Sequence, residues 1–501
     1  MARLDREAGL PPQRPAHGWR RLLVESKRPD RVASHPQAHW WVVATVCVGA
    51  FMGQLDASIV VIALPTLQAH FHSQLGGVEW VSLAYLLTLI ALVPALGRFA
   101  DMVGRKLLYI YGFAIFIVGS GLCGVAPNLL SLDAFRVLQG LGAAMLQANS
   151  VALIVQAMPR EKLGRGIGVQ GAAQALGLCL GPGVGGLLLL WGGWRLIFLI
   201  NVPAGLIGFG LGWFLLPRSR YLAEREAIDW IGIGLFVVAV ASLLVALSIG
   251  DQAGWSSALV IASLVLSLLF GLSFLWWERR VTAPMMRLRL FLGRTFSFGI
   301  SSGLLSYLTL FGTLFVFPFF LRFAGRLNPG EAGLRLLILP LALGLAAPLA
   351  GILADRWGPR RLTVSGMALV GAALLGFAIH PTSGAVLLVE LAMVGIGLGA
   401  FTPPNNAAIM GSVARNQAGM ASGILNMTRG MGTALGVALA GLVFGLSAGV
   451  SISHISSPLL ARQGTVAAAI FLAAMALAAA LLSGLRGGRE SSQGQERLAE
   501  V

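Results

Sequence analysis

The chain has 501 residues, of which 56% are hydrophobic and only 11% are charged. A soluble globular protein would carry roughly twice that share of charged residues, so this composition excludes a soluble fold. The net charge of +16 would suggest a nucleic-acid partner for a soluble protein, but in a membrane protein it raises the question of which side of the bilayer carries the charge.

Residues 1–39 precede the first apolar run and are polar, with many proline and arginine residues. The stretch is too long to be the charged region of a cleaved signal peptide, and we expect a disordered cytoplasmic tail. The three cysteines, Cys47, Cys123 and Cys179, all lie in apolar runs. The sequence therefore predicts neither a disulfide framework nor a metal site.

Fourteen apolar runs of membrane-spanning length follow this tail. They cover approximately residues 40–64, 77–97, 107–126, 131–156, 163–188, 196–216, 229–248, 255–277, 296–320, 331–353, 362–380, 385–408, 419–446 and 464–485. The sequence therefore predicts an all-α polytopic membrane protein. Because the number of spans is even, both termini are expected on the same side.

The distribution of basic residues predicts the orientation. Most of the 36 lysine and arginine residues fall in the two tails and in the loops on their side of the membrane. The loops of the opposite side carry five, Arg195, Arg322, Arg326, Arg335 and Arg462. Cytoplasmic loops are enriched in Lys and Arg, so we expect both termini in the cytoplasm. The loop after residue 320 is the exception, since three of those five lie in it.

One charged motif occurs twice. Residues 97–106, Gly-Arg-Phe-Ala-Asp-Met-Val-Gly-Arg-Lys, are echoed by residues 351–361, Gly-Ile-Leu-Ala-Asp-Arg-Trp-Gly-Pro-Arg-Arg. Each copy lies in a break between two apolar runs. Several glycines between residues 164 and 186 also recur between residues 419 and 441. Two copies at equivalent positions favour a duplicated membrane protein over an ordinary basic loop with a chance aspartate.

The repeat also divides the chain. Six helices with short loops need only about 190 residues, so the distance between the two copies leaves room for an inserted helical pair. We expect six-helix bundles over residues 40–216 and 296–485, cytoplasmic linkers and the inserted pair over 217–295, and a cytoplasmic tail over 486–501. An axis along the membrane normal would relate the bundles, and the pair would bridge them.

The doubled motif resembles the loop between the second and third helices of the major facilitator superfamily. Residues 55–65, with Ala57 where threonine is more usual, and residues 194–203 resemble signatures of its 14-helix drug:proton antiporters. The resemblance covers nearly all of residues 40–485 and implies the major facilitator fold. It also implies a cytoplasmic gate made of Gly97, Asp101, Gly104, Arg105, Lys106 and Asp355. Because a helix N-terminus stabilises a carboxylate, we expect Asp101 near the start of the helix at Gly419–Gly423.

Asp56 lies inside the first apolar run and Arg136 inside the fourth. A charge in an apolar helix is expensive and is a candidate for function. At 1.5 Å per residue the two lie at similar depths in a core of about 30 Å, so we expect an ion pair or a water-bridged pair. Because burial disfavours a charged carboxylate, Asp56 is predicted to couple transport to protons. Residues 136–140 resemble the superfamily motif whose arginine assists proton transfer.

Each of these two residues has a structural alternative. Asp56 would serve only as a salt-bridge partner, or Arg136 would extend outward to water beside Asp133. Glu390 is the other carboxylate well inside a span. The resemblance implies that it faces the same space as Asp56, as a substrate or second proton site, against a packing role near the outer surface. The predicted substrate cavity contains Glu390, Gln139, Met145, Gln147 and Tyr307.

The fifth span contains the run Gly177–Gly186, which resembles a motif that marks exporters within the superfamily. Glycines let helices approach closely, and a proline removes one backbone hydrogen bond, so this helix is expected to bend. A pure packing role is the alternative. The motif residues are Gly177, Gly181, Pro182, Gly185 and Gly186.

Together these features predict a proton-coupled multidrug efflux antiporter, not an enzyme, in a bacterial inner membrane. It would export lipophilic compounds, cationic drugs among them, by alternating access. The alternatives are a dedicated exporter of an endogenous metabolite, lipid or siderophore, and a non-transporting membrane sensor. The sequence has no phosphate-binding loop, so neither ATP nor a cofactor is expected. The expected partners are protons, a small-molecule substrate and the lipid bilayer, without nucleic acid, and a periplasmic adaptor would be a separate protein.

Overall fold

The computed structural model describes residues 25–73, 75–219, 229–327, 329–449 and 457–486, and helices dominate this part of the chain. Thirteen helical segments in it are long and apolar enough to cross a membrane. Helix α6 (Leu163–Gly192) adds a fourteenth, because its two parts on either side of residue 182 are apolar and lie at 45° to one another. The predicted all-α polytopic fold is confirmed.

The helices form two bundles and a separate pair. The N-terminal bundle contains α2 (Ala38–Phe71), α3 (Leu75–Val103), α4 (Arg105–Gly124), α5 (Leu129–Ala157), α6, and α7 (Trp194–Leu199) with α8 (Asn201–Leu215) as one span. The inserted pair is α9 (Trp230–Ala253) and α10 (Ala258–Glu278). The C-terminal bundle contains α11 (Arg294–Phe319), α12 (Pro329–Leu336) with α13 (Ile338–Trp357), α14 (Pro359–Ile379), α15 (Ala385–Gly411), α16 (Ala418–Ala448) and α17 (Pro458–Gly484).

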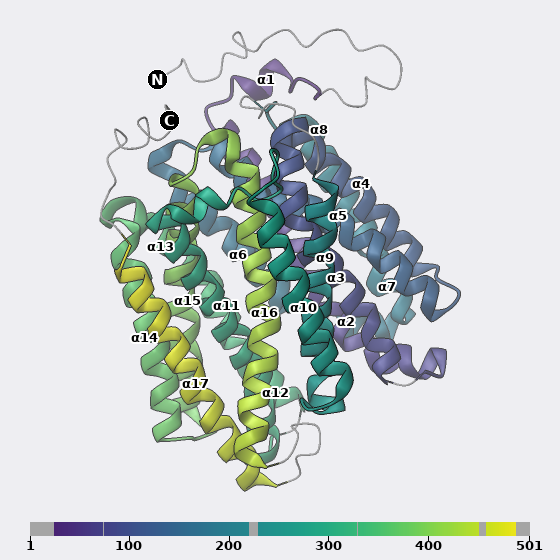
Figure 1. Ribbon diagram of the computed structural model, residues 1–501, viewed down its shortest axis with the longest axis vertical. Coiled ribbons are helices and arrows are strands. Elements are labelled where there is room, and N and C mark those ends of the chain that lie inside the picture. Colours follow the sequence, from purple (N-terminus) through teal and green to yellow (C-terminus); the bar gives the residue numbers. More distant parts are fainter. Residues whose placement is uncertain (1–24, 74, 220–228, 328, 450–456, 487–501) are drawn as a thin grey trace.

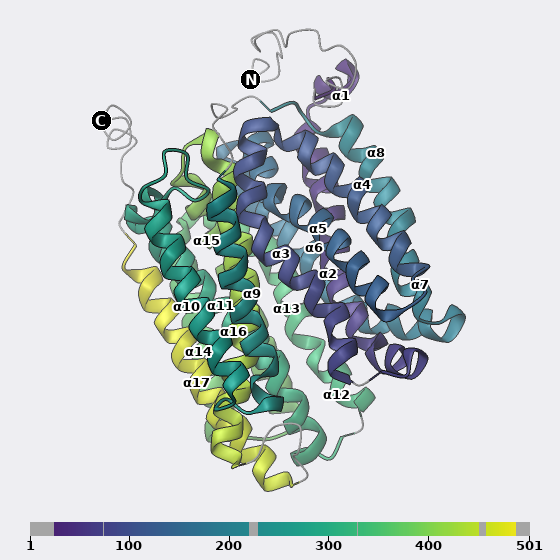
Figure 2. The same ribbon diagram turned by 45° about the vertical axis from the view of Figure 1, so that its right-hand side comes forward.

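The two bundles meet along two helix pairs, α3 with α16 and α6 with α13. The bundles lean apart toward the end opposite the two chain termini (Figure 1). Helix α9 contacts both α3 and α16, while α10 packs mainly on α9 at the outside of the molecule (Figure 2). The inserted pair therefore contacts both bundles along one side.

The glycines of the doubled motif lie at both helix pairs of this interface. Gly104 and Gly358 stand before α4 and α14 with φ of 126° and 82°, a region that a residue with a side chain rarely adopts. The carbonyl oxygen of Gly419 lies where a side chain at Gly97 would point, and that of Gly164 lies in the same way against Gly351. The motif glycines therefore permit the turn and the close approach of the two bundles.

The structure describes residues 25–39 of the stretch expected to be a disordered tail, and it differs from that expectation. A short helix, α1 (Asp30–Ala33), precedes α2, and Glu25 is buried. The Glu25 carboxylate accepts hydrogen bonds from the Ser219 backbone N–H at 2.6 Å and hydroxyl at 2.9 Å, and from the Leu107 N–H at 3.3 Å. One acidic side chain thus holds this segment against the starts of α4 and the linker, a contact that composition does not reveal.

Candidate functional site

Asp56 is fully buried in α2 and accepts three hydrogen bonds. Arg136 on α5 donates from Nη1 to one carboxylate oxygen at 2.7 Å. Gln139 on α5 and Asn201 on α8 each donate from the side-chain amide to the other oxygen at 2.9 Å. The predicted ion pair is confirmed, and three donors from two helices converge on one carboxylate.

Arg136 is held from several sides and is only 1% exposed. Its Nε donates to the carbonyl of Val81 on α3 at 2.8 Å, and its Nη1 also donates to Gln139 Oε1 at 2.6 Å. The ring of Tyr85 lies over the guanidinium, with its centroid 4.2 Å from Cζ. Arg136 therefore does not extend outward to water, and the alternative of a snorkelling side chain is wrong.

The Asp56 carboxylate is part of a wider hydrogen-bond network. A charged carboxylate satisfies all three donors and offsets the buried Arg136 charge. Gln139 extends the network, because its amide also donates to Ser120 at 3.0 Å and Ser120 in turn donates to the Phe198 carbonyl at 2.8 Å. Asp56 is thus linked to residues of α3, α4, α5, α7 and α8.

The glycine motif places α6 directly on the helix that carries Asp56. A side chain at Gly177 would lie 2.5 Å from the Phe51 carbonyl oxygen and 3.0 Å from the Gln54 Cβ, and one at Gly185 would lie 2.9 Å from Ile59. Gly181 faces Ser58 in the same way. Gly186 has nothing within 4 Å of an added Cβ, and the side chain of Pro182 lies outside the described part. The motif therefore brings α6 and α2 together through three glycines spaced four residues apart.

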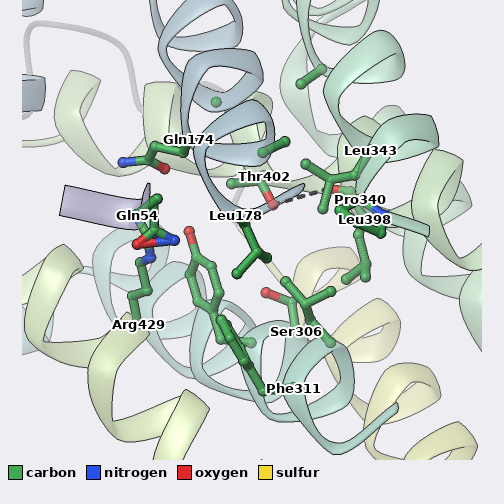
Figure 3. A pocket seen from close by; sticks show the side chains of 15 residues that line it. Gln54, Gln174, Leu178, Ser306, Phe311, Pro340, Leu343, Leu398, Thr402 and Arg429 are labelled. Atoms are coloured by element: carbon green, nitrogen blue, oxygen red, sulfur yellow. Dashed lines mark hydrogen bonds between the residues drawn. The ribbon is translucent and has the colours of Figure 1, made fainter. Parts of the chain in front are cut away.

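A cavity lies between the bundles. Side chains from both bundles line it, and Figure 3 shows them converging from α2, α6, α11, α13, α15 and α16. Gln54 lines this cavity and lies two residues before Asp56, so α2 contributes to both the cavity wall and the buried carboxylate site. The lining includes Tyr307, as predicted.

Four other residues predicted to line the substrate cavity lie elsewhere. Gln139 belongs to the Asp56 network. Met145 is buried in a core cluster with Ala100 and Leu108, because its position on α5 faces α4. Gln147 lies near Gly53 of α2, and its carbonyl accepts a hydrogen bond from Asn426 of α16 at 2.8 Å.

Glu390 is the fourth, and its carboxylate lies next to Gly376 on α14 rather than in the cavity. Leu398 and Thr402 are the α15 residues that line the cavity. At about 100° per residue, Glu390 points about 80° and 120° away from them around the helix, which explains its position. The expectation that Glu390 and Asp56 face one space is therefore wrong.

The residues predicted to form the cytoplasmic gate lie at the end of the molecule that carries α1. Asp101 accepts hydrogen bonds from the backbone N–H groups of Gly419 and Met420, both at 2.8 Å, and pairs with Arg105 at 2.7 Å. Its predicted position beside the start of α16 is confirmed. Lys106 Nζ donates to the Ser26 carbonyl at 2.9 Å.

Asp355 makes the equivalent contact in the second half. Its carboxylate accepts a hydrogen bond from the backbone N–H of Gly164, at the start of α6, at 3.0 Å. The repeat places Pro359 where the first copy has Arg105, so Asp355 lacks the basic partner four residues on. Asp355 is exposed, whereas Asp101 is fully buried.

Three residues of the site were not predicted as such from the sequence. Asn201 lies in residues 194–203, a stretch that resembles an antiporter signature, and this resemblance was the available signal. Tyr85 contacts Arg136, and Arg429 lines the cavity. Within the described residues, no group of three or more His, Cys, Asp or Glu side chains could hold a metal ion.

Arg486 lies two residues after the end of α17, and its side chain contacts two other helices of the C-terminal bundle. Its Nη2 donates to Ser302 of α11 at 2.6 Å and to Asn405 of α15. Burial lowers the pKa of Arg486 to about 10, because it disfavours the charged form. The side chain still keeps its charge at neutral pH and ties three helices together.

Comparisons with known proteins add a family context. A sequence model described as Major Facilitator Superfamily matches residues 46–325 and 299–499. The chain is 34% identical over 401 residues to the riboflavin transporter RibZ of Clostridioides difficile, covering 80% of this chain and 87% of that protein. It is 35% identical over 399 residues to the multidrug resistance protein Stp of Mycobacterium tuberculosis, covering 79% and 74%.

A solved structure shares the fold. The proton:xylose symporter XylE bound to 6-bromo-6-deoxy-D-glucose aligns with a TM-score of 0.60 over 89% of this chain and 95% of that chain, at 16% identity. At this identity the likeness concerns the arrangement of the helices alone.

Proposed function

Because the chain belongs to the major facilitator superfamily, and is therefore a polytopic membrane transporter, we propose that it is a proton-coupled exporter of lipophilic compounds. Inward proton flow through Asp56, assisted by Arg136, would drive the export. The similarity to a multidrug resistance protein supports drug efflux as the class of activity. The substrate of a relative does not by itself identify the substrate of this chain. The proposal therefore rests on the geometry around Asp56.

The observation that carries the proposal is the fully buried Asp56, which three donors hold on a helix that also lines the cavity. A proton that reaches Asp56 neutralises it and frees Arg136 from its partner. The α2–α5 contact then weakens, and the helix that carries Gln54 can move relative to the cavity. This sequence couples a proton to alternating access without a further cofactor.

A dedicated exporter of one endogenous metabolite is the second candidate, and the similarity to a riboflavin transporter favours it. The two candidates differ in breadth. A panel of dyes and antibiotics tested in a host without its own pumps would show protection against several unrelated compounds for a multidrug exporter. Protection against none, with efflux of one metabolite, would favour the dedicated exporter. A sensor would move nothing.

The proposal also includes the type of membrane and the orientation of the chain in it. The basic residues near the termini support a cytoplasmic location of both ends in a bacterial inner membrane. In that orientation Asp101 and Asp355 close the cytoplasmic side, and the cavity between the bundles opens outward. Any periplasmic adaptor would be a separate protein that meets short outer loops.

The decisive experiment replaces Asp56. Asp56→Asn keeps the shape but cannot carry a proton, so it should lose efflux driven by an imposed proton gradient in proteoliposomes while it still binds substrate. Asp56→Glu should retain part of the activity, because a titrating group survives at a shifted position. Substrate efflux and internal pH are followed together by fluorescence.

Glu390→Gln is the matched control, since that carboxylate lies outside the cavity. It should pump at close to the wild-type rate. If Asp56→Asn still pumps uphill and still releases protons inward, the coupling site lies elsewhere.

A further inference from the structure

Arg429 is a buried cation that the coupling mechanism does not use. It lies on α16 with 9% of its surface exposed, and it lines the cavity between the bundles. Within the described part of the chain, no carboxylate pairs with its guanidinium and no hydrogen bond joins the guanidinium to a neighbour. The ring of Tyr307 lies beside it, with its centroid 5.7 Å from Cζ. A buried charge left without a partner is expensive.

Other buried arginines of this protein have partners. Arg136 pairs with Asp56 and Arg105 with Asp101, each at 2.7 Å, and Arg486 donates to Ser302 at 2.6 Å. These arginines stabilise contacts between or within helices. Arg429 instead presents its donors to the cavity, where an incoming molecule can meet them.

The cavity lining has a distinct chemical character. Among the described residues that line the cavity, Arg429 is the one charged residue, and five others are polar: Gln54, Gln174, Ser306, Tyr307 and Thr402. The hydroxyls of Ser306 and Thr402 already donate to backbone carbonyls of their own helices. Figure 3 shows Arg429 pointing toward Gln54, while Leu178, Phe311 and Leu343 form apolar wall. The cavity thus combines the hydrogen-bond donors of Arg429 with a mainly apolar surface.

We infer that Arg429 is the point at which this cavity recognises its substrate, and that the recognised group is an oxygen acceptor, a carboxylate or a carbonyl, on an otherwise apolar compound. The inference rests on the proposed transport function and narrows its substrate class. An oxygen acceptor supplies the hydrogen bonds that the guanidinium lacks, and the apolar remainder packs on the cavity wall. A permanently cationic compound would face Arg429 without any lining carboxylate to offset the repulsion.

The test uses three fluorescent probes with one apolar frame: pyrenebutanoate, its methyl ester and pyrenebutyl-trimethylammonium. Equilibrium binding to the purified full-length protein in nanodiscs is measured without any pH gradient. The wild-type protein should bind the carboxylate and the ester about tenfold or more tightly than the ammonium probe. The carboxylate and ester arms separate a charged acceptor from a neutral one.

Variants assign the preference to Arg429. Arg429→Met keeps the length of the side chain and removes its donors, so it should lose the preference for both acceptors. Arg429→Lys keeps a charge and should retain the preference for the carboxylate. Arg462→Met changes an exposed arginine on α17 and should bind all three probes as the wild-type protein does. Thermal melting of each variant shows whether it is folded.

The inference is overturned if the wild-type protein binds the carboxylate and ester no more tightly than the ammonium probe. The same conclusion follows if folded Arg429→Met keeps the wild-type ranking. Because no gradient is applied, these results do not depend on proton coupling. Failure of the Asp56 experiment would reject antiport and leave the binding preference standing.

Discussion

At the scale of single residues, the Asp56 site shows what a sequence can and cannot disclose. Helix depth alone predicts that Asp56 and Arg136 meet, because rise per residue is a constant. The contribution of Asn201 depends on how α8 packs on α2, and no local pattern encodes that packing. For Glu390 the depth in the membrane could be predicted from the sequence. The direction of its side chain could not, because that direction depends on how α15 is rotated about its own axis.

Asn201 offers a direct test of how the carboxylate is held. Asn201→Ala removes one of the three donors to the buried Asp56 carboxylate, and a hydrogen bond to a charged group contributes about 1.5–3 kcal/mol. The free energy of unfolding should therefore fall by about that amount, and thermal melting of the purified variant measures the change. Ser120→Ala, which contacts Asp56 only through Gln139, should lower the free energy of unfolding less, and equal melting temperatures in all three proteins would contradict this account.

At the scale of helices, the two aspartates at the ends of α3 and α13 make comparable but unequal contacts. Asp101→Asn should weaken two backbone hydrogen bonds and remove the ion pair with Arg105. Asp355→Asn should weaken the hydrogen bond from Gly164 but removes no such ion pair, because the second half has no arginine at the position equivalent to Arg105. Export should fall in both variants, more in Asp101→Asn, while substrate binding persists. A cysteine in place of the buried Ala418 reports opening, and its labelling rate should rise about tenfold with Asp101→Asn.

Glu161→Gln serves as the control for this gate, because Glu161 is an exposed acidic residue beside the start of α6. Its labelling rate and export should match the wild-type protein. A wild-type export rate in Asp101→Asn would show that the contact is not a gate.

The contact between α6 and α2 can be tested with two glycines of one helix. Gly177→Ala forces a Cβ against the Phe51 carbonyl, whereas a Cβ at Gly183 meets nothing within 4 Å. Both changes raise helix propensity by about 1 kcal/mol, so their difference isolates the packing. We expect Gly177→Ala to lower the free energy of unfolding by about 1–3 kcal/mol relative to Gly183→Ala. Thermal melting of the purified variants measures the difference, and equal melting temperatures would be inconsistent with close packing.

At the scale of the whole molecule, most of the fold could be predicted because a bilayer imposes long apolar spans and the repeat fixes their grouping. The bend within α6 was predicted from the glycines and the proline of its motif, and the inserted helical pair from the repeat spacing. The ordered segment around Glu25 could not be predicted, because a single buried carboxylate orders a stretch whose composition is otherwise polar. The substrate cavity was only partly predicted, since it depends on which face each helix presents.

The orientation in the membrane is predicted from the distribution of basic residues along the whole chain. With the three native cysteines replaced, Gly254→Cys between α9 and α10 should react with an impermeant reagent added to intact cells. Arg287→Cys, between α10 and α11, should react only after permeabilisation. Labelling of Arg287→Cys from outside would invert the proposed topology.

The paired aspartate contacts also bear on how long the proposed closed state would last. The Asp101 and Asp355 contacts lie at separate helix pairs, so in the proposed mechanism both must break before the bundles separate at the cytoplasmic end. Their contributions to the free-energy barrier would add, and their effects on the lifetime of the closed state would therefore multiply. Two contacts of modest strength would thus hold that state far longer than either contact alone. Repetition of one motif in both halves of the chain would supply this long lifetime.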